Sequence, residues 1–353
     1  MKKSDSFITK ENKFKQMKKH QVTIIDIARE LGISKSTVSR ALSGHPNVHE
    51  QTRTKVLRLA EEFEYQRNMF SVNLMRNATL TLGIIVPEFH RSFFPQVIMS
   101  AQEAAKEAGY NLVIAQSDEN YETEVANTKV MLQYQVDGVL ISLTKETQNF
   151  DHLKQFERRG IPIVLFNRVC DQIMAPKVIV DDQLGAFAAV EHLIKTGKKR
   201  IGHLTGPETL KVCKNRKEGY FDALKKYNIA PDDDLVISYD LNPGKVKIYV
   251  NHFLAMEPRP DALFCINDTT AVEVIKHLKI KGLKIPEDIA VVGFSNDSVS
   301  TFIEPQLTTV AQPIELLGRT AVSMLIEQIA RDPDKWKANT VVLKTTLIIR
   351  DSS

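Results

Sequence analysis

The chain of 353 residues is poor in cysteine, with only Cys170, Cys213 and Cys265. Their odd number and wide spacing exclude a disulfide framework and fit no zinc-binding pattern, so we expect ordinary buried thiols. No run of 18 or more apolar residues occurs, which excludes a membrane-spanning helix. The basic N-terminus also lacks the apolar stretch of a secretory signal. We therefore expect a cytoplasmic protein with no membrane partner.

Catalytic motifs are absent as well. The sequence has no P-loop, no HExxH and no GxSxG pattern. Its one acidic run, Asp232–Asp234, follows Pro231 and is typical of a solvated loop rather than of a metal site. We therefore expect a protein that is not an enzyme and that holds no metal or cofactor.

The most informative stretch that the sequence does contain is residues 22–42, VTIIDIARELGISKSTVSRAL. Thr23 is a favourable N-cap for a first helix, and Gly32 can adopt the left-handed conformation that ends it. Ser34 then caps a second helix with an apolar inner face. The outward positions of that second helix carry hydroxyl and cationic side chains, namely Lys35, Ser36, Ser39 and Arg40. Two short helices around a glycine turn predict a helix-turn-helix, whose second helix reads DNA bases.

Such a helix pair, taken alone, is equally typical of a surface helix hairpin. Two further features favour the DNA-binding interpretation. Residues 50–63 predict a third amphipathic helix, which a small three-helix domain needs to close its core. Residues 1–77 carry 15 Lys+Arg against 8 Asp+Glu, a net charge of +7, whereas the rest of the chain has a net charge of −3. Positive charge on this part of the chain suits a phosphate backbone.

The remainder of the chain predicts an α/β core. From residue 80 onward, short apolar runs alternate with helical segments; the runs are LGIIV, NLVIA, GVLIS, PIVLF, RIGHL, ALFCI and AVVGF. This alternation indicates parallel sheets covered by helices on both faces. About 270 residues are more than one domain of roughly 100–200 residues needs, so we expect two lobes. Ligands in such folds bind at the carboxyl ends of the strands.

These residues carry a resemblance to a known family. VTIIDIARELGISKSTVSRALSGHPNVHEQTRTKVLRLAEE closely resembles the headpiece of the lactose/galactose repressor (LacI/GalR) family of bacterial transcription regulators. The likeness continues through NLMR, LGIIVPEFHRSFFPQV, IPIVLFNR, VDDQLGAFAAVEHLIKTGKKRIGHLTG, NRKEGYFDAL and VVGFSNDS, in that order. The resemblance implies an all-α helix-turn-helix headpiece followed by a periplasmic-binding-protein-like α/β core of two lobes with parallel sheets.

The resemblance also implies the domain organisation. We expect a basic, disordered tail over residues 1–20, a DNA-binding domain over 21–66 and a hinge helix or linker over 67–79. Met17 is an alternative start of the chain. The effector-binding and dimerisation core then covers 80–353, with one lobe at about 80–180 and 312–340 and the other at about 181–311 and 341–353. No C-terminal heptad repeat follows, so we expect a dimer rather than a coiled-coil tetramer.

The family's DNA contacts carry over residue by residue. Lys35, Ser36 and Arg40 occupy base-reading positions, and Arg40 can bond a guanine with two hydrogen bonds. The expected phosphate contacts are Thr23, Ser34, Thr37, Asn47 and Asn68. Leu74 matches the hinge leucine that inserts into the central base step of the minor groove. Arg67 and Met75 depart from the family's usual residues beside this hinge, so hinge ordering and the preferred central step are open.

The resemblance further implies a small-molecule effector between the lobes. The matching positions are Phe93, Phe94, Asn167, Arg168, Arg216, Leu241, Asp268 and Asn296. Without the resemblance, a phenylalanine pair is typical of a lobe core and a single arginine of a surface ion pair. Asn296 stands where many members have an aspartate, and the loss of that charge predicts that a sugar acid or sugar phosphate is accepted as well as a sugar. Apolar Leu210 and Val212 argue against a purine.

Together these features predict a dimeric regulator that binds a near-palindromic operator in double-stranded DNA and represses a carbohydrate-utilisation operon. A small sugar-like effector is expected to shift the protein between DNA-binding and non-binding states. Two alternatives stay open. One is a cytoplasmic sugar-binding protein with a vestigial headpiece, and the other is a global regulator controlled by a protein corepressor.

Overall fold

The computed structural model describes residues 22–65, 78–336 and 338–353, which form two separate units divided between Ala78 and Thr79. The expected tail over 1–20 and most of the hinge, with Asn68 and Leu74, lie outside the described residues. Among the described helices, none is long and apolar enough to cross a bilayer.

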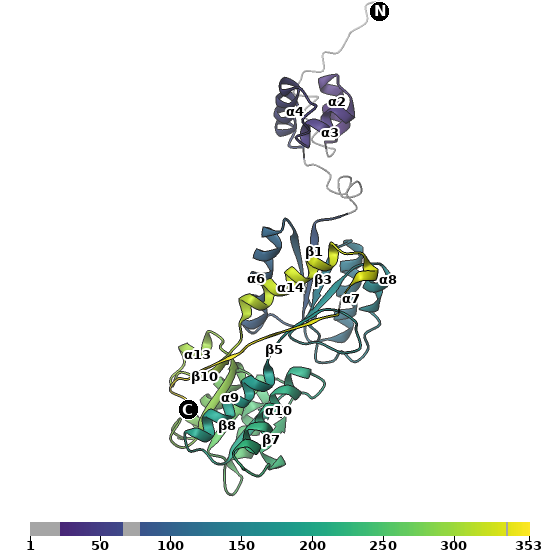
Figure 1. Cartoon of the computed structure of the whole chain (residues 1–353). Coiled ribbons are helices and arrows are strands. Elements are labelled where there is room, and N and C mark those ends of the chain that lie inside the picture. The colour runs from purple at the N-terminus through teal and green to yellow at the C-terminus, as the bar shows by residue number, and fades with distance from the viewer. Residues whose placement is uncertain (1–21, 66–77, 337) are drawn as a thin grey trace, which may run out of the picture. The chain divides into compact units, whose positions relative to one another are not determined.

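The first unit is the predicted three-helix headpiece, formed by α2 (Ile24–Leu31), α3 (Lys35–Leu42) and α4 (Glu50–Glu62) (Figure 1). The backbone N–H of Thr23 donates to the Asp26 carboxylate at 3.0 Å, which closes the start of α2. Gly32 ends α2 with φ +63°, and the Ser34 hydroxyl accepts from the backbone N–H of Thr37 at 3.1 Å to begin α3. The apolar faces of the three helices meet in one small core around Ile27, Val38 and Val56.

The second unit has two lobes, each built on a six-stranded sheet (Figure 1). The first sheet has the order β11-β5-β4-β3-β1-β2, with all its strands parallel. Its strands are β1 (Thr81–Val86), β2 (Asn111–Gln116), β3 (Gly138–Ile141), β4 (Ile163–Phe166), β5 (Lys177–Val180) and β11 (Thr340–Leu343). One face is covered by α6 (Phe93–Glu107) and α14 (Ile314–Ile329), and the other by α7 (Tyr121–Gln133) and α8 (Lys154–Arg158).

The second sheet has the order β12-β10-β9-β8-β6-β7, and only the edge pair β10–β12 is antiparallel. Its strands are β6 (Ile201–Thr205), β7 (Val236–Ser238), β8 (Ala262–Cys265), β9 (Ala290–Ser295), β10 (Thr308–Ala311) and β12 (Thr346–Ile348). Two helices cover one face, α9 (Asp182–Lys195) and α10 (Lys211–Lys226). On the other face lie α11 (Val246–Leu254) and α12 (Asp268–Ile280), with the short α13 (Val299–Phe302) beside α12.

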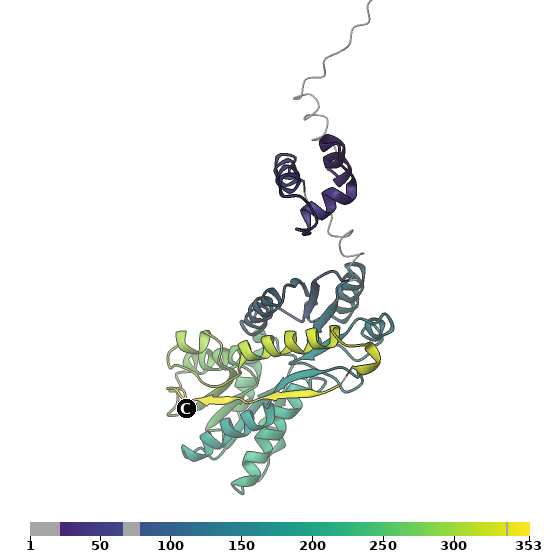
Figure 2. The ribbon, with the colours of Figure 1, turned by 45° about the horizontal axis from the view of Figure 1, so that its top comes forward.

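The chain passes between the lobes three times, after β5, after β10 and between β11 and β12. Figure 2 shows the last crossing as the long yellow segment that runs from one lobe to the other. The structure differs from the expected lobe limit at residue 340, because β11 pairs with β5 and so leaves residues 341–343 in the first lobe. The seven apolar runs noted in the sequence form β1, β2, β3, β4, β6, β8 and β9, and the sheets add five further short strands.

Candidate functional site

The outward face of α3 presents the side chains expected to read DNA. Lys35, Ser36 and Arg40 are all exposed. Within the described residues, the side chains of Lys35 and Arg40 form no ion pair or hydrogen bond, so both cations are available to a partner. The Ser36 hydroxyl lies 2.7 Å from that of Ser34, which caps the helix. The buried Val38 fixes the opposite side of α3 against the headpiece core, and the reading face is therefore held outward.

The structure places three of the expected phosphate contacts, Thr23, Ser34 and Thr37, at the starts of α2 and α3, and Asn47 in a loop. Thr23 donates its hydroxyl to Asp26, and the Ser34 and Thr37 hydroxyls lie 2.8 Å apart, so these side chains also stabilise the helix starts. Asn47 is exposed in the loop between α3 and α4. The described headpiece, residues 22–65, contains six basic and six acidic side chains. The net charge of +7 of residues 1–77 therefore comes from the segments before and after the three helices. Of the three helices, only α3 has no acidic residue.

A cleft lies between the two lobes of the core. It is reached by the ends of strands from both sheets, as expected for this type of fold. Six of the eight expected effector residues line it: Phe93, Phe94, Asn167, Arg168, Arg216 and Leu241. Phe93 and Phe94 also belong to the first lobe's core, so the cleft floor and the core share these rings.

Arg216 is held in place by a buried ion pair. From α10, its Nε donates to Oδ1 of Asp182 at 2.8 Å and its Nη2 lies 2.7 Å from the same oxygen. Its Nη1 donates to the carbonyl of Ile266 at 2.6 Å, and the guanidinium lies 3.6 Å from the centre of the Phe294 ring. Burial raises the pKa of Asp182, and Arg216 opposes that rise. Two of the five N–H groups of Arg216 have no partner among the described residues and can bind a ligand.

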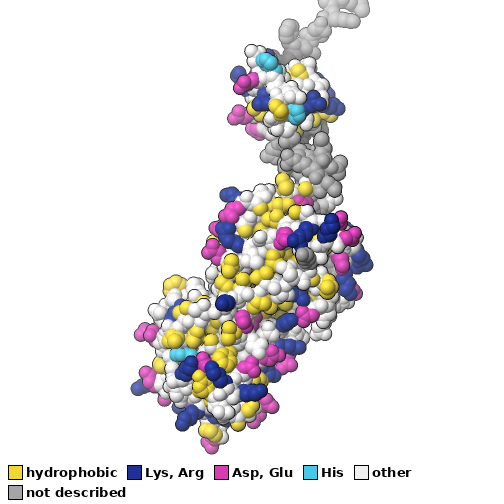
Figure 3. Space-filling view, viewed as in Figure 1, with side chains coloured by type: hydrophobic (Ala, Val, Ile, Leu, Met, Phe, Trp, Pro, Cys, Tyr) yellow, Lys and Arg dark blue, Asp and Glu magenta, His cyan; other side chains and the backbone are white. Residues whose placement is uncertain are grey.

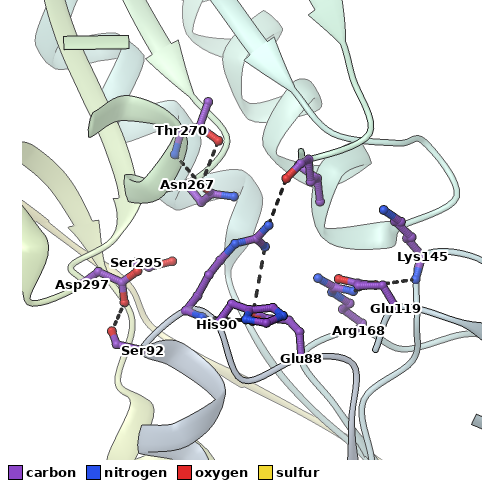
Figure 4. Close-up of polar contacts among 12 residues, drawn as sticks. Glu88, His90, Ser92, Glu119, Lys145, Arg168, Asn267, Thr270, Ser295 and Asp297 are labelled. Atoms are coloured by element: carbon purple, nitrogen blue, oxygen red, sulfur yellow. Dashed lines mark hydrogen bonds and ion pairs between the residues drawn. The ribbon is translucent and has the colours of Figure 1, made fainter. Parts of the chain in front are cut away.

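Arg168 is anchored in the same way in the first lobe. Its Nη1 donates to the Glu119 carboxylate at 2.8 Å, and its guanidinium lies 5.7 Å from the Phe94 ring centre. Although burial alone would raise it, the pKa of Glu119 is lowered by the charge of Arg168 and by the backbone N–H of Lys145. Figure 4 shows Glu119 between Arg168 and Lys145. The Nε and Nη2 groups of Arg168 have no partner among the described residues.

Several cleft residues were not expected from the sequence: Glu88, Arg91, Asn267, Ser295, Asp297 and Gln312. They lie at or just after the ends of strands in the two lobes, and this position is the sequence signal that could have found them. The Oε1 atoms of Glu88 and Gln312 are buried and accept no hydrogen bond in the structure. The Gln312 oxygen is therefore an acceptor available to a ligand hydroxyl, and the Glu88 oxygen lies 4.0 Å from Nη1 of Arg91 without accepting a hydrogen bond from it.

Asp268 does not line the cleft, contrary to expectation. Its side chain is fully buried beneath the cleft, where it accepts from the Thr309 hydroxyl at 2.5 Å and from the backbone N–H of Asp297 at 2.7 Å. Asn267, one residue earlier, lines the cleft instead and caps α12. Asp268 therefore fixes the loop after β9.

Asn296 also lies outside the cleft lining. Its backbone has φ +55°, and its side-chain oxygen accepts from Nη2 of Arg350 at 2.7 Å. The next residue, Asp297, lines the cleft and accepts a hydrogen bond from the Ser92 hydroxyl of the other lobe (Figure 4). A carboxylate is thus present on this side of the cleft, one residue after Asn296.

The free energy of unfolding should depend on pH through the ionisation of the Asp268 carboxyl group. Burial raises its pKa to about 7, even though the Thr309 hydroxyl and the Asp297 N–H act to lower it. In the unfolded chain this carboxyl ionises near 3.8, so from about pH 4 to 7 the folded protein holds a proton that the unfolded chain has lost. We expect the free energy of unfolding to fall as the pH rises through this window, by up to about 4 kcal/mol.

Chemical denaturation of the wild type and of Asp268→Asn at several pH values measures this effect. The amide does not titrate, so the difference in stability between the two proteins should change between about pH 4 and 7 and be constant above that range. A difference that is the same at every pH would contradict the raised pKa.

Comparison with known proteins agrees with both units. Residues 79–350 match the family "Periplasmic binding proteins and sugar binding domain of LacI family", and residues 23–68 match "Bacterial regulatory proteins, lacI family". Catabolite control protein A of Priestia megaterium is 32% identical over 88% of this chain and 93% of its own length. The transcriptional repressor CytR of Escherichia coli K12 is 32% identical over 87% of this chain and 89% of its own length.

Solved structures show the same architecture. The transcriptional regulator CelR, solved in complex with cellobiose, matches with a TM-score of 0.72 at 27% identity. The match covers 94% of this chain and 100% of the CelR chain. The Lac repressor dimer bound to operator and the anti-inducer ONPF has a TM-score of 0.83 at 24% identity, over 94% of this chain and 99% of that one, and it supports the fold. The chain therefore belongs to the LacI family of bacterial regulatory proteins, a non-enzymatic family of helix-turn-helix transcriptional repressors with a periplasmic-binding-protein-like effector domain.

Proposed function

We propose that this protein represses a carbohydrate-utilisation operon in the cytoplasm and is released from, or directed to, its operator by a neutral sugar-like effector. The observation that carries the proposal is the cleft between the lobes, which is lined by the anchored Arg168 and Arg216, by the acceptor side chains of Glu88 and Gln312, and by the rings of Phe93 and Phe94. A sugar ring offers this same combination of hydroxyl groups that donate and accept with an apolar face. In the same chain, the exposed face of α3 binds the operator DNA in this proposal.

The charge of the cleft favours a neutral ligand over an anion. Arg216 is paired with Asp182, and Arg168 is paired with Glu119. Arg91 lies 4.0 Å from Glu88 and donates to the carbonyl of Leu241. Asp297 adds a further negative charge, so the cleft has no surplus cation with which to offset a carboxylate or a phosphate. We therefore propose a neutral sugar and set aside the sugar acids and sugar phosphates.

In this proposal Lys35, Ser36 and Arg40 contact bases, while Thr23, Ser34, Thr37 and Asn47 contact phosphates. Asn68, which would contact a phosphate, and Leu74, which would enter the minor groove, lie outside the described residues. An operator bound by a homodimer has two matching half-sites, since two-fold protein symmetry requires them.

The core offers a surface for such a homodimer. Figure 3 shows apolar side chains gathered over the face of the core that carries α14 and α6. Exposed apolar side chains on these two helices include Met99 of α6 and Leu316 of α14. Apolar surface of this kind marks a protein interface more often than it marks open solvent.

Selection of bound DNA from a random duplex library, with the full-length protein at a stated salt concentration, tests the proposed function. A near-palindromic site is expected, and the genes beside its genomic matches would identify the pathway. Failure to enrich any sequence, with and without added sugars, would overturn the repressor and favour a sugar-binding protein with a vestigial headpiece.

A further inference from the structure

The turn that follows β7 in the second lobe forms hydrogen bonds with the first lobe. We call residues 239–242 the β7 turn. The backbone carbonyl of Asp240 accepts from Nζ of Lys145 at 3.2 Å, and the next carbonyl, that of Leu241, accepts from Nη2 of Arg91 at 3.2 Å. Two consecutive carbonyls of one lobe are thus held by two cations from separate loops of the other. A hydrogen bond from a charged donor is roughly twice as strong as one between neutral groups.

The β7 turn is fixed in the conformation that presents these carbonyls. Leu241 has φ +63°, a left-handed conformation that is unusual for a large side chain and persists only where the surroundings enforce it. The Asp240 carboxylate accepts from the backbone N–H of Asn242 at 3.2 Å and lies 2.6 Å from Nζ of Lys245. The Leu241 side chain is buried and packs closely over Gly206, where a Cβ would lie 2.8 Å from it. Strained turns of this kind occur preferentially at functional sites.

Lys145 contacts the second lobe through its backbone as well as its side chain. Its carbonyl accepts from the Thr209 hydroxyl of the second lobe at 3.1 Å, and its backbone N–H donates to the Glu119 carboxylate of its own lobe at 3.1 Å. The preceding residue, Thr144, donates its backbone N–H to the buried carboxylate of Glu124 at 2.9 Å. The loop that carries Lys145 is therefore anchored in the first lobe while it holds the second.

Other contacts between the lobes are weaker or lie inside the effector cleft. Lys211 lies 2.9 Å from Asp171 of the first lobe, but their side chains are 41% and 68% exposed, and exposed ion pairs stabilise little. The carboxylate that accepts from the Ser92 hydroxyl, that of Asp297, lines the cleft. By contrast, Lys145 is not among the residues that line the effector cleft. A ligand in the cleft therefore does not compete directly for the hydrogen bond from Lys145 to the β7 turn.

The hydrogen bonds to the β7 turn are connected to the effector cleft from both lobes. The Leu241 side chain lines the cleft, and its carbonyl accepts from Arg91. In the first lobe, the Glu119 carboxylate accepts both from the backbone of Lys145 and from Nη1 of Arg168, which lines the cleft (Figure 4). A displacement of Leu241 or Arg168 by a ligand would therefore also displace a group that joins the lobes.

We propose that the β7 turn is an interlobe latch, through which Arg91 and Lys145 hold the lobes in one relative orientation and so set the affinity for operator DNA. The inference rests on the proposed function, in which an effector in the cleft shifts the protein between two states. A ligand shifts such an equilibrium only if its interactions differ between the states. Arg91 and Lys145 are positioning residues in this latch, and Leu241 and Arg168 link it to the ligand.

Distances between spin labels in the full-length protein test the latch. Lys129→Cys on α7 and Lys247→Cys on α11 place a label at an exposed position of each lobe, while the three native cysteines are buried. Dilution with unlabelled protein suppresses distances between protomers, and the wild-type latch should give one narrow distribution. Lys145→Met removes Nζ and keeps the backbone contacts, so the distribution should broaden and move to longer distances.

Two further variants make the result specific. Thr209→Val removes the other hydrogen bond that crosses to Lys145 and gives the same test if Lys145→Met fails to fold. Lys154→Met is the matched control, because Lys154 is paired with Asp151 of its own lobe, and it should leave the distribution as in the wild type. The latch is overturned if Lys145→Met and Thr209→Val both give the wild-type distribution, or if the control changes it equally.

Operator binding tests the regulatory part of the proposal. Without any sugar, Lys145→Met should bind the selected operator with an affinity that differs about fivefold or more from the wild type, whereas Lys154→Met should not. A changed label distance with an unchanged operator affinity would overturn this part. The distance measurement needs neither DNA nor sugar, so its failure is distinct from a failure of the operator selection.

Discussion

Arg216→Met is expected to lower the free energy of unfolding by about 3–5 kcal/mol, because it leaves the Asp182 carboxylate buried without its cation. Both side chains of this pair are almost fully buried, at 6% and 2% exposed. The substitution also removes a hydrogen bond to the carbonyl of Ile266 and the stacking over Phe294. Urea denaturation followed by circular dichroism measures the change.

The double variant Arg216→Met with Asp182→Asn is the control for this effect. Its amide carries no charge, so a large part of the lost stability should return. If the double variant is as unstable as the single one, the loss comes from packing and not from an unpaired charge. In the double variant, which is expected to fold, sugar binding should still be lost, since the two free N–H groups of Arg216 are missing.

Arg40→Ala is expected to reduce affinity for the selected operator by about 1–3 kcal/mol at each half-site, or roughly fivefold to 150-fold per half-site. A dimer on a symmetric operator contains two copies of this contact, so the losses at the two half-sites combine. Arg40 is exposed on α3, and its side chain has no partner within the described residues that would have to be broken first. Repeating the DNA selection with the variant should show relaxed preference at one position of each half-site.

Arg58→Ala provides the matched control, because Arg58 is an exposed arginine of the same headpiece that lies on α4 and not on α3. Its removal should change affinity only slightly and leave the base preference intact. If Arg40→Ala retains the wild-type preference at every position, Arg40 does not read a base and the proposed orientation of α3 on DNA fails.

The headpiece was predictable because its signals are local. A threonine, a glycine and a serine at positions 23, 32 and 34 set the ends of two helices through contacts with residues three or four positions away. The net charge of residues 1–77 says little about DNA binding by the three helices, because the positive excess lies in the segments flanking them. The specific cations on α3, rather than the net charge, therefore support DNA reading.

The effector cleft was predictable in outline and not in detail. Six expected residues line it, but Asp268 and Asn296 each face away while a neighbouring residue takes the place in the lining. At the end of β9 the backbone turns through positive φ at Ser295 and Asn296. A turn of this kind redirects the side chains that follow it, so the residue that reaches the cleft differs by one from the residue the sequence suggests. The carboxylate on this side of the cleft is therefore that of Asp297.

The sequence by itself determined the family, the order of the two units, the helix ends of the headpiece and the alternation of strands and helices. These depend on caps, turns and periodic apolar positions, which act over a few residues. Only the tertiary structure decided which charges are neutralised in the cleft. Asp182 meets Arg216 across 34 positions, Glu119 meets Arg168 across 49, and Ser92 meets Asp297 across 205. Such pairs form because the ends of parallel strands and two lobes converge in space, a convergence that no local pattern records.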